Sequence, residues 1–176
     1  MISLLSQSPL AFILYMAALL IAISIHEFSH AYAAEKLGDP TPRLQGRVTL
    51  NPRAHIDLTG LLFLFFFGFG WGKPVQFDPF NLKNPPRDAA IISIAGPISN
   101  ILLAAVLAIL FSIFPSPFFL PFIQLNVILA VFNLLPIHPL DGFKIVGGLL
   151  PKEQAREWYQ LERLGIFFLL ALIIPI

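Results

Sequence analysis

The chain has 176 residues, of which 57% are hydrophobic and only 12% are charged, and its mean hydropathy is +0.80. Soluble domains are about 45–50% apolar and about 25% charged, so this composition excludes a soluble single-domain enzyme and a disordered chain. A net charge of +1, without any run of basic residues, excludes a nucleic-acid-binding protein. The sequence has no cysteine, which excludes disulfides and thiolate metal sites. A small integral membrane protein remains.

Four apolar stretches predict membrane-spanning helices, each of which needs about 20 mainly apolar residues. The predicted spans cover about residues 9–34, 89–114, 118–136 and 160–176. The last has the shortest apolar part, but Trp158 and Tyr159 just before it are side chains that anchor helices at a membrane interface. The sequence therefore predicts an all-α polytopic membrane protein with about four transmembrane helices.

A fifth apolar run, residues 58–70, is too short to span a membrane and is rich in Phe and Gly. It is either a re-entrant or interfacial segment or a short helix packed on the bundle, and the sequence leaves both open. All eleven Lys and Arg residues lie either between the first and second spans or between residue 136 and the apolar part of the fourth. Because positively charged loops stay in the cytoplasm, we expect both termini outside and this fifth run to begin and end on the cytoplasmic side.

A polar cluster, His26-Glu27-Phe28-Ser29-His30, interrupts the first apolar span. On a helix, positions i and i+4 share one face, so both imidazoles can reach one cation. Glu27 is turned from the first histidine by about 100° and can face a water held by that cation, as in zinc hydrolases with an H-E-x-x-H motif. Each such group costs about 2–3 kcal/mol at mid-membrane when it is unpaired. A metal site is therefore favoured over a purely structural hydrogen-bond cluster.

A catalytic zinc site needs a third protein ligand and leaves the fourth position to water. Asp141 is the first candidate because it follows the third span in a segment broken by two prolines, residues 133–142. Irregular backbone at membrane depth is tolerated where it lines a cavity or is buried in protein, so a carboxylate there can meet the histidines. His138, His55 and Asp57 remain rival ligands. The alternative roles for these three are contacts beside the ligands, a solvent-facing position or a helix cap.

Two motifs, residues 26–30 and 133–142, resemble those of the site-2 protease family of intramembrane zinc metalloproteases. Further segments of the resemblance are residues 46–52, 55–57, 72–75 and 95–100, so that it covers about residues 20–148. The resemblance implies a three-helix catalytic core with one Zn²⁺ per chain on His26, His30 and Asp141. Asn133 would be a polar helper of catalysis near the zinc, and Glu27 the general base that activates the zinc-bound water.

The resemblance also implies an intramembrane protease that cleaves transmembrane protein or peptide substrates. The whole chain, residues 1–176, would be one protease domain, a minimal prokaryotic-type member without PDZ or CBS domains. We expect it in the plasma membrane with its site toward the cytoplasm. A membrane metal carrier and an inactive relative that only binds membrane proteins are the alternatives, although a carrier has no use for the non-ligating carboxylate of Glu27. The sequence indicates neither the substrate nor the oligomeric state.

Two further segments carry structural predictions. In residues 43–50, Val48 and Leu50 alternate with polar side chains, which predicts a short strand. That strand would form a small surface β-hairpin with residues 75–77 or an edge that pairs with an unwound substrate. The small and polar residues of the 96–100 segment predict close helix packing, with Asn100 bonding across to a neighbouring helix.

Overall fold

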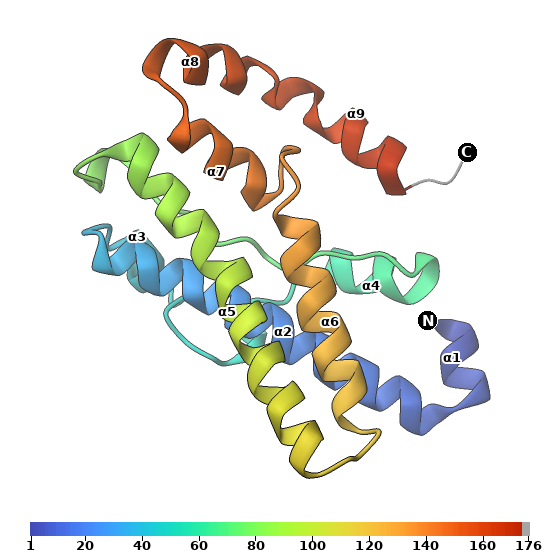
Figure 1. Ribbon diagram of the computed structural model, residues 1–176. Coiled ribbons are helices and arrows are strands. Elements are labelled where there is room, and N and C mark those ends of the chain that lie inside the picture. The colour runs from blue at the N-terminus through green and yellow to red at the C-terminus, as the bar shows by residue number, and fades with distance from the viewer. Residues whose placement is uncertain (174–176) are drawn as a thin grey trace.

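The computed structural model describes residues 1–173, most of which are helical (Figure 1). In chain order the elements are α1 (Ile2–Gln7), α2 (Pro9–Lys36), α3 (Thr41–Leu44), the 3₁₀ turn η1 (Pro52–Ala54), α4 (Leu58–Phe67), the 3₁₀ turn η2 (Pro79–Asn81), α5 (Pro85–Ile113), α6 (Phe119–Asn133), α7 (Asp141–Leu149), α8 (Lys152–Gln160) and α9 (Glu162–Ile173). The core consists of α2, α5, α6 and α7. In it α2 packs against α5 and α6, and α5 packs against α6 and α7. The shorter α8 and α9 follow at the same end of the molecule as α7 (Figure 1).

The first two predicted spans are confirmed as long apolar helices, with small differences at their ends. With 28 and 29 residues, α2 and α5 are long and apolar enough to cross a membrane. At 1.5 Å per residue each is about 42 Å long, more than the hydrocarbon thickness of about 30 Å. The Ser8 hydroxyl caps α2 by accepting a hydrogen bond from the Ala11 N–H. Pro85 begins α5, where the N–H that proline lacks would have no helical partner.

Small side chains allow these helices to approach one another closely. The fully buried alanines of α2 are Ala18, Ala22, Ala31 and Ala34. On α5 the facing segment includes Gly96, Pro97 and Asn100, which are all buried. Small residues at helix interfaces let backbones pack at short distance in membranes. The predicted packing role of the 96–100 segment agrees with this arrangement.

The third and fourth predicted spans are not confirmed as spans. The third is a helix of 15 residues, α6, and the fourth is a helix of 12 residues, α9. At 1.5 Å per residue, α6 and the described part of α9 are about 22 Å and 18 Å long, shorter than the hydrocarbon layer of about 30 Å. The predicted 118–136 helix ends at Asn133 because proline at position 136 disfavours helical geometry in the residue before it. The end of the predicted 160–176 helix lies outside the described residues.

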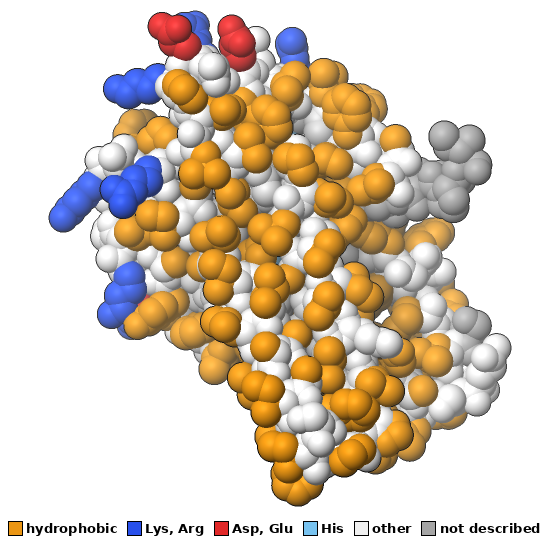
Figure 2. All heavy atoms as spheres, in the orientation of Figure 1, with side chains coloured by type: hydrophobic (Ala, Val, Ile, Leu, Met, Phe, Trp, Pro, Cys, Tyr) orange, Lys and Arg blue, Asp and Glu red, His pale blue; other side chains and the backbone are white. Residues whose placement is uncertain are grey.

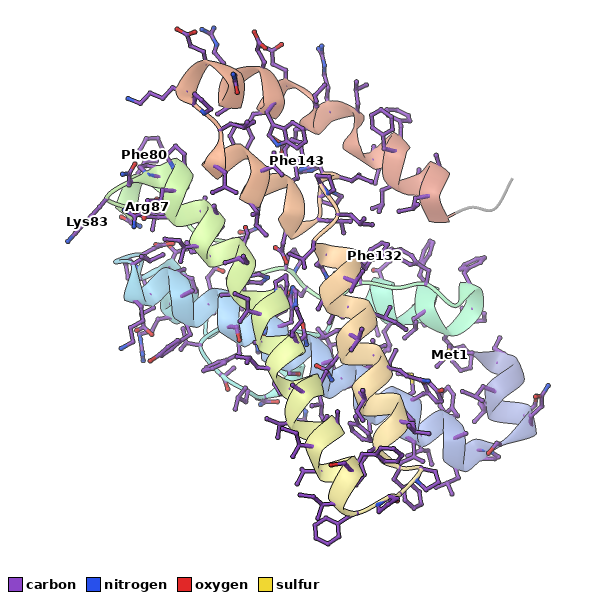
Figure 3. The ribbon with its side chains drawn as sticks, viewed as in Figure 1. Met1, Phe80, Lys83, Arg87, Phe132 and Phe143 are labelled. Atoms are coloured by element: carbon purple, nitrogen blue, oxygen red, sulfur yellow. The ribbon has the colours of Figure 1, made fainter. Side chains whose placement is uncertain are left out.

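Apolar and charged side chains separate over the surface. Figure 2 shows apolar side chains across the face of α5 and α6, while Lys, Arg, Asp and Glu gather at one end. Lys83 and Arg87, beside the start of α5, point outward at that end (Figure 3). On α5, Leu102 and Ile109 are each 61% exposed. A continuous apolar surface of this kind exceeds what soluble monomers expose and suits contact with lipid.

The phenylalanine-rich run at 58–70 forms the helix α4, followed by a turn back. The Asp57 carboxylate caps α4 by accepting a hydrogen bond from the Gly60 N–H at 2.9 Å, so the predicted capping role of Asp57 is confirmed. Phe65 meets the edge of the Phe12 ring from α2. Phe66 and several neighbours are exposed, so α4 is a short helix that packs on the bundle along one side only. Its position relative to a membrane stays a prediction.

The predicted β-hairpin at 43–50 is wrong. Among residues 1–173 there is no strand, and this segment contains the end of α3 followed by turns. Gly46 has a φ of 68°, in the left-handed region that breaks an extended chain. The next side chain, Arg47, is buried and donates to the carbonyls of Ala54 and Lys73. These contacts with distant loops hold the segment in a compact form that the local alternation pattern does not reveal.

A short backbone contact, rather than a sheet, joins the two loops next to α4. Ile56 and Gly72 form an isolated antiparallel bridge, and the Lys73 N–H donates to the His55 carbonyl at 2.8 Å. Because Arg47 donates to the Lys73 carbonyl as well, the stretch after residue 72 is held beside the loop that precedes α4. This stretch leads directly to a contact with Glu27.

Candidate metal centre

Three potential ligands meet in the interior where α2 approaches the start of α7. His26 and His30 lie one turn apart on α2, and Asp141 is the first residue of α7. The Asp141 Oδ2 is 3.0 Å from His26 Nε2 and 3.2 Å from His30 Nε2. One ligand atom from each residue lies within 4.8 Å of the other two, and both histidines are buried. The predicted i, i+4 pair and the predicted third residue are thus brought together.

The loop between α6 and α7 delivers Asp141 by close backbone packing. A side-chain carbon at Gly142 would lie 2.3 Å from the carbonyl oxygens of Leu134 and Leu135, so only glycine fits at this position. The following residue, Phe143, is 3% exposed and points toward α8 (Figure 3). Its ring stacks on Trp158 with 5.1 Å between centroids, and the Trp158 indole N–H donates to the Phe143 carbonyl. The predicted interfacial anchor Trp158 therefore holds α8 against the helix that carries Asp141.

The outer nitrogens of both imidazoles face hydrogen-bond acceptors. His30 Nδ1 lies 2.7 Å from the backbone carbonyl of Ile92, and His26 Nδ1 lies 2.6 Å from the Asn100 Oδ1. A carbonyl oxygen can only accept, so in each ring Nδ1 carries the proton. In the neutral ring, Nε2 then has the lone pair, and it faces Asp141. Such a donation from a ligand histidine to a carbonyl fixes the ring for metal binding.

The donor set fits a zinc ion. Two imidazole lone pairs and a carboxylate oxygen repel one another at 3.0–3.2 Å unless a cation or additional protons lie between them. Zinc bonds of about 2.0–2.2 Å in a tetrahedron separate neighbouring ligand atoms by about 3.4 Å, close to the observed spacing. Two histidines and one carboxylate also match the three-ligand composition of catalytic zinc sites.

Gly96 leaves room on the α5 side of the centre. A side-chain carbon there would lie 2.5 Å from His30 Nε2 and 2.7 Å from the His26 Cε1. Real Cβ atoms do not approach other atoms so closely, and His30 is held by its bond to Ile92. Glycine at 96 therefore lets α5 lie directly against the two rings without filling the space at the ligand nitrogens.

Glu27 lies next to the centre in sequence but outside the group of three ligands. Its side chain is half-buried, and its Oε2 accepts a hydrogen bond from the Val75 N–H at 2.9 Å. Val75 belongs to the stretch that Arg47 holds through the Lys73 carbonyl. The Glu27 carboxylate is therefore oriented by the loop after α4.

The other predicted polar residues have separate partners. The Asn133 amide donates to the Leu129 carbonyl one turn back on α6, and its role as a catalytic helper stays a prediction. His138 Nδ1 is 3.6 Å from a carboxylate oxygen of Glu162 on α9. His55 is fully buried, and its Nε2 donates to the Thr49 carbonyl at 2.8 Å. His138 and His55, like the helix-capping Asp57, are thus not among the three residues that converge.

Sequence reasoning missed three contacts behind the histidines. Asn100 was expected to bond across helices, but not to His26. Asn126, in the middle of α6, carried no predicted role, although a fully buried amide in an apolar span signals a specific partner. The Ile92 carbonyl that orients His30 has no side-chain signal at all, because every residue carries a carbonyl.

Comparison with known proteins agrees with this centre. The model of peptidase family M50 matches residues 14–120 and 111–173. YwhC of Bacillus subtilis (strain 168), which is named as a zinc metalloprotease, is 38% identical over 96% of this chain and 84% of its own length. Rip2 of Mycobacterium tuberculosis (strain H37Rv), named in the same way, is 32% identical over 93% of this chain and 67% of its own length. MJ0611 of Methanocaldococcus jannaschii, also named as a zinc metalloprotease, is 30% identical over 79% of this chain and 72% of its own length. No solved structure matches significantly.

The fold and the donor set define a membrane zinc metalloprotease. The chain belongs to peptidase family M50, the site-2 protease family, and its metal cofactor is zinc.

Proposed function

We propose that this chain is an intramembrane metalloendopeptidase that hydrolyses peptide bonds within or near transmembrane segments of protein substrates. The observation that supports this most strongly is the convergence of His26, His30 and Asp141 at a helix long and apolar enough to span a membrane. A protease site in that setting acts on chains that are themselves in the membrane. The lipid bilayer and membrane-protein substrates are then the partners.

His26, His30 and Asp141 would hold the zinc ion. When bound, zinc polarises a water and the carbonyl of the bond to be cut. Glu27 takes a proton from the attacking water and later passes it to the leaving amine. The Val75 N–H supports this role because it orients the carboxylate while the second oxygen remains available. Asn133, at the end of α6, is proposed to stabilise the negative charge that develops on the carbonyl oxygen.

A substrate helix hides its peptide bonds in hydrogen bonds along its own axis, so it has to unwind before it can be cut. We therefore expect cleavage near residues with low helix propensity, such as glycine and proline. The basic loops, including Lys83 and Arg87, support a plasma-membrane orientation with the centre toward the cytoplasm. Because the chain has no cysteine, a single cysteine at position 83 tests this directly. Its labelling by an impermeant thiol reagent from the outer face of intact cells would contradict the orientation.

The test of the proposed function is a comparison of the wild type with Glu27→Gln, both purified in detergent. We expect Glu27→Gln to retain zinc, because Glu27 is not one of the three ligands, and to lose cleavage of a single-span reporter. General acid–base catalysis contributes about 10²–10⁴-fold to rate, which sets the expected loss. Glu157→Gln, the same substitution at an exposed position of α8, is the control and is expected to leave both unchanged. A Glu27→Gln variant with wild-type turnover would remove the assignment of Glu27 as the general base. A zinc-loaded wild type that cleaves no reporter would instead leave a metal carrier as the better description.

A further inference from the structure

We propose that Asn126 is a positioning residue that acts through Asn100 to hold His26 in the orientation and tautomer that leave Nε2 free for zinc. The inference rests on the proposed role of His26 as a zinc ligand. It assigns a function to two buried amides that neither contact Asp141 in the described structure nor belong to the H-E-x-x-H motif.

The three side chains form a hydrogen-bonded chain across the helical core. His26 comes from α2, Asn100 from α5 and Asn126 from α6, so all three packed helices contribute one member. Asn100 and Asn126 are fully buried, and His26 is 4% exposed. Asn100 Oδ1 lies 2.6 Å from His26 Nδ1, and Asn100 Nδ2 lies 2.7 Å from Asn126 Oδ1. Polar groups at this depth are costly unless every member of the network is bonded.

Two backbone carbonyls determine the direction of every bond in the chain, because a carbonyl can only accept. Asn126 Nδ2 donates to the Phe122 carbonyl at 2.8 Å, so its Oδ1 turns to Asn100. Asn100 Nδ2 donates to that oxygen and to the Ala22 carbonyl at 3.0 Å, so the Asn100 Oδ1 turns to His26. An amide oxygen also only accepts. His26 Nδ1 therefore carries the proton, and Nε2 keeps its lone pair for the metal centre.

The opposite orientation of the Asn100 amide would prevent His26 from binding zinc. Its NH₂ group would then donate to His26 Nδ1, which would move the ring proton to Nε2 and remove the ligand lone pair. Asn126 prevents that reversal by presenting an acceptor to Nδ2, and the Ala22 carbonyl presents a second one. Loss of Asn126 is thus expected to weaken the site less than loss of Asn100.

His30 provides the contrast within the same centre. Its Nδ1 donates to the backbone carbonyl of Ile92, which cannot reverse and which no side-chain substitution removes. The two ligand histidines are therefore oriented by different means, one by backbone alone and the other by a relay of side chains. Of the two Nδ1 hydrogen bonds that orient these rings, only the one at His26 can be removed by substitution of a partner side chain.

The experiment measures zinc affinity of the full chain in detergent by competition with a chromophoric chelator. Partners of this kind typically change metal affinity by about 10–100-fold, so we expect a loss of about 100-fold in Asn100→Leu and about 10-fold in Asn126→Leu. Asn126→Asp is the conservative variant, because a carboxyl oxygen still accepts from Asn100 Nδ2, and it is expected to retain wild-type affinity. Gln124→Leu, which removes an exposed amide from the same helix, is the control and is expected to have no effect.

A purely structural role for Asn126 makes a different prediction. In that case Asn126→Leu lowers the melting temperature of the zinc-free protein and leaves zinc affinity unchanged, which would overturn the proposal. Equal losses of affinity in Asn126→Leu and Asn126→Asp would overturn it as well. If zinc affinity proved insensitive to His26→Gln, the assignment of His26 as a ligand would have failed instead, so the two failures are distinguishable.

A measurement on the wild type keeps the proposal testable if the leucine variants fail to fold. The ¹⁵N resonances of the His26 ring in the zinc-loaded protein are expected to show a protonated Nδ1 and a metal-bound Nε2. An unprotonated Nδ1 would overturn the proposal whatever the variants do.

Discussion

Asp39 and Asp141 are both carboxylates close to α2 that are largely withdrawn from solvent, and their surroundings are opposite. Asp39, just after α2, is fully buried and accepts four hydrogen bonds from its neighbours. The donors are the Thr41 N–H and hydroxyl, the Asp78 N–H and the Asn81 amide. Asp141 has a side chain that is 15% exposed and faces the Nε2 atoms of two imidazoles, whose Nδ1 atoms donate to carbonyl oxygens on the far side of each ring.

The difference shows that burial alone does not identify a functional carboxylate. The Asp39 carboxylate is satisfied by hydrogen-bond donors and holds the loops around η2 to the end of α2, which is a structural role. Asp141 meets imidazole nitrogens that bring no fixed donor, and that arrangement becomes favourable only with a cation or additional protons between them. The partners of a buried acid, rather than its depth, separate a structural position from a metal centre.

The largest expected effect is a difference in zinc content between a variant of Asp141 and a variant of Asp39. Asp141→Ala removes one of three ligands, and since supporting partners alone change metal affinity by about 10–100-fold, we expect a loss above about 100-fold together with loss of cleavage. Asp39→Asn is expected to purify with a full equivalent of zinc per folded chain. Metal analysis of both proteins after the same dialysis makes the comparison. A full equivalent of zinc in Asp141→Ala would contradict the assignment of Asp141 as a zinc ligand.

A smaller effect is expected when the space beside the ligands is filled instead of a ligand being removed. In Gly96→Ala, the added Cβ would lie 2.5 Å from His30 Nε2, which is too close, so α5 or the ring has to shift. We expect zinc affinity to fall by about 10–100-fold, in the range found for residues that support metal ligands. Ile98→Ala, at a position 45% exposed on the same helix, is the control. Chelator competition measures the zinc affinity of both variants, and unchanged affinity in Gly96→Ala would show that the space beside the rings does not have to stay empty.

The smallest effect concerns stability and its pH dependence at Asp39. Burial alone would raise the pKa of Asp39, but hydrogen bonds from Thr41, Asn81 and Asp78 hold it below its ordinary value of 3.8. Because the folded-state pKa lies below the unfolded one, the stabilisation is complete above about pH 4 and is lost as the pH falls toward the folded-state pKa.

Asp39→Asn turns an acceptor into a donor opposite an N–H, at an expected cost of about 1–3 kcal/mol. Melting curves in detergent should therefore show the variant below the wild type at neutral pH, with the gap narrowing below about pH 4. A gap that widens in acid would mean that the carboxylate is not the stabilising form.

Local patterns made part of this molecule predictable. The i, i+4 spacing of His26 and His30 needs only one helix to bring the rings to one face, and the lengths of α2 and α5 follow from continuous apolar composition. The family resemblance added the zinc and the enzyme class, which the comparisons bear out. Asp141 was the favoured third residue, but the sequence left His138, among others, as a rival.

Other features depended on contacts that local patterns do not carry. The alternation at 43–50 indicated a strand, but Arg47 is drawn into a buried position by the carbonyls of Ala54 and Lys73. Asn126 looked like an isolated polar residue because its partner Asn100 is in another helix. Helix α6 fell short of the predicted 118–136 span, because apolar composition does not report where a helix ends.

The sequence by itself determined the histidine pair that shares one helix face, the apolar character of the chain and the family, because these depend on residue type and on spacing along the chain. Only the tertiary structure decided which carboxylate approaches the pair and where His138 goes instead. It also decided which groups hold each imidazole, the Ile92 carbonyl for one ring and the two asparagines for the other. The physical reason is that these choices rest on bonds between helices, whose partners lie far apart in the chain and meet only when the helices pack.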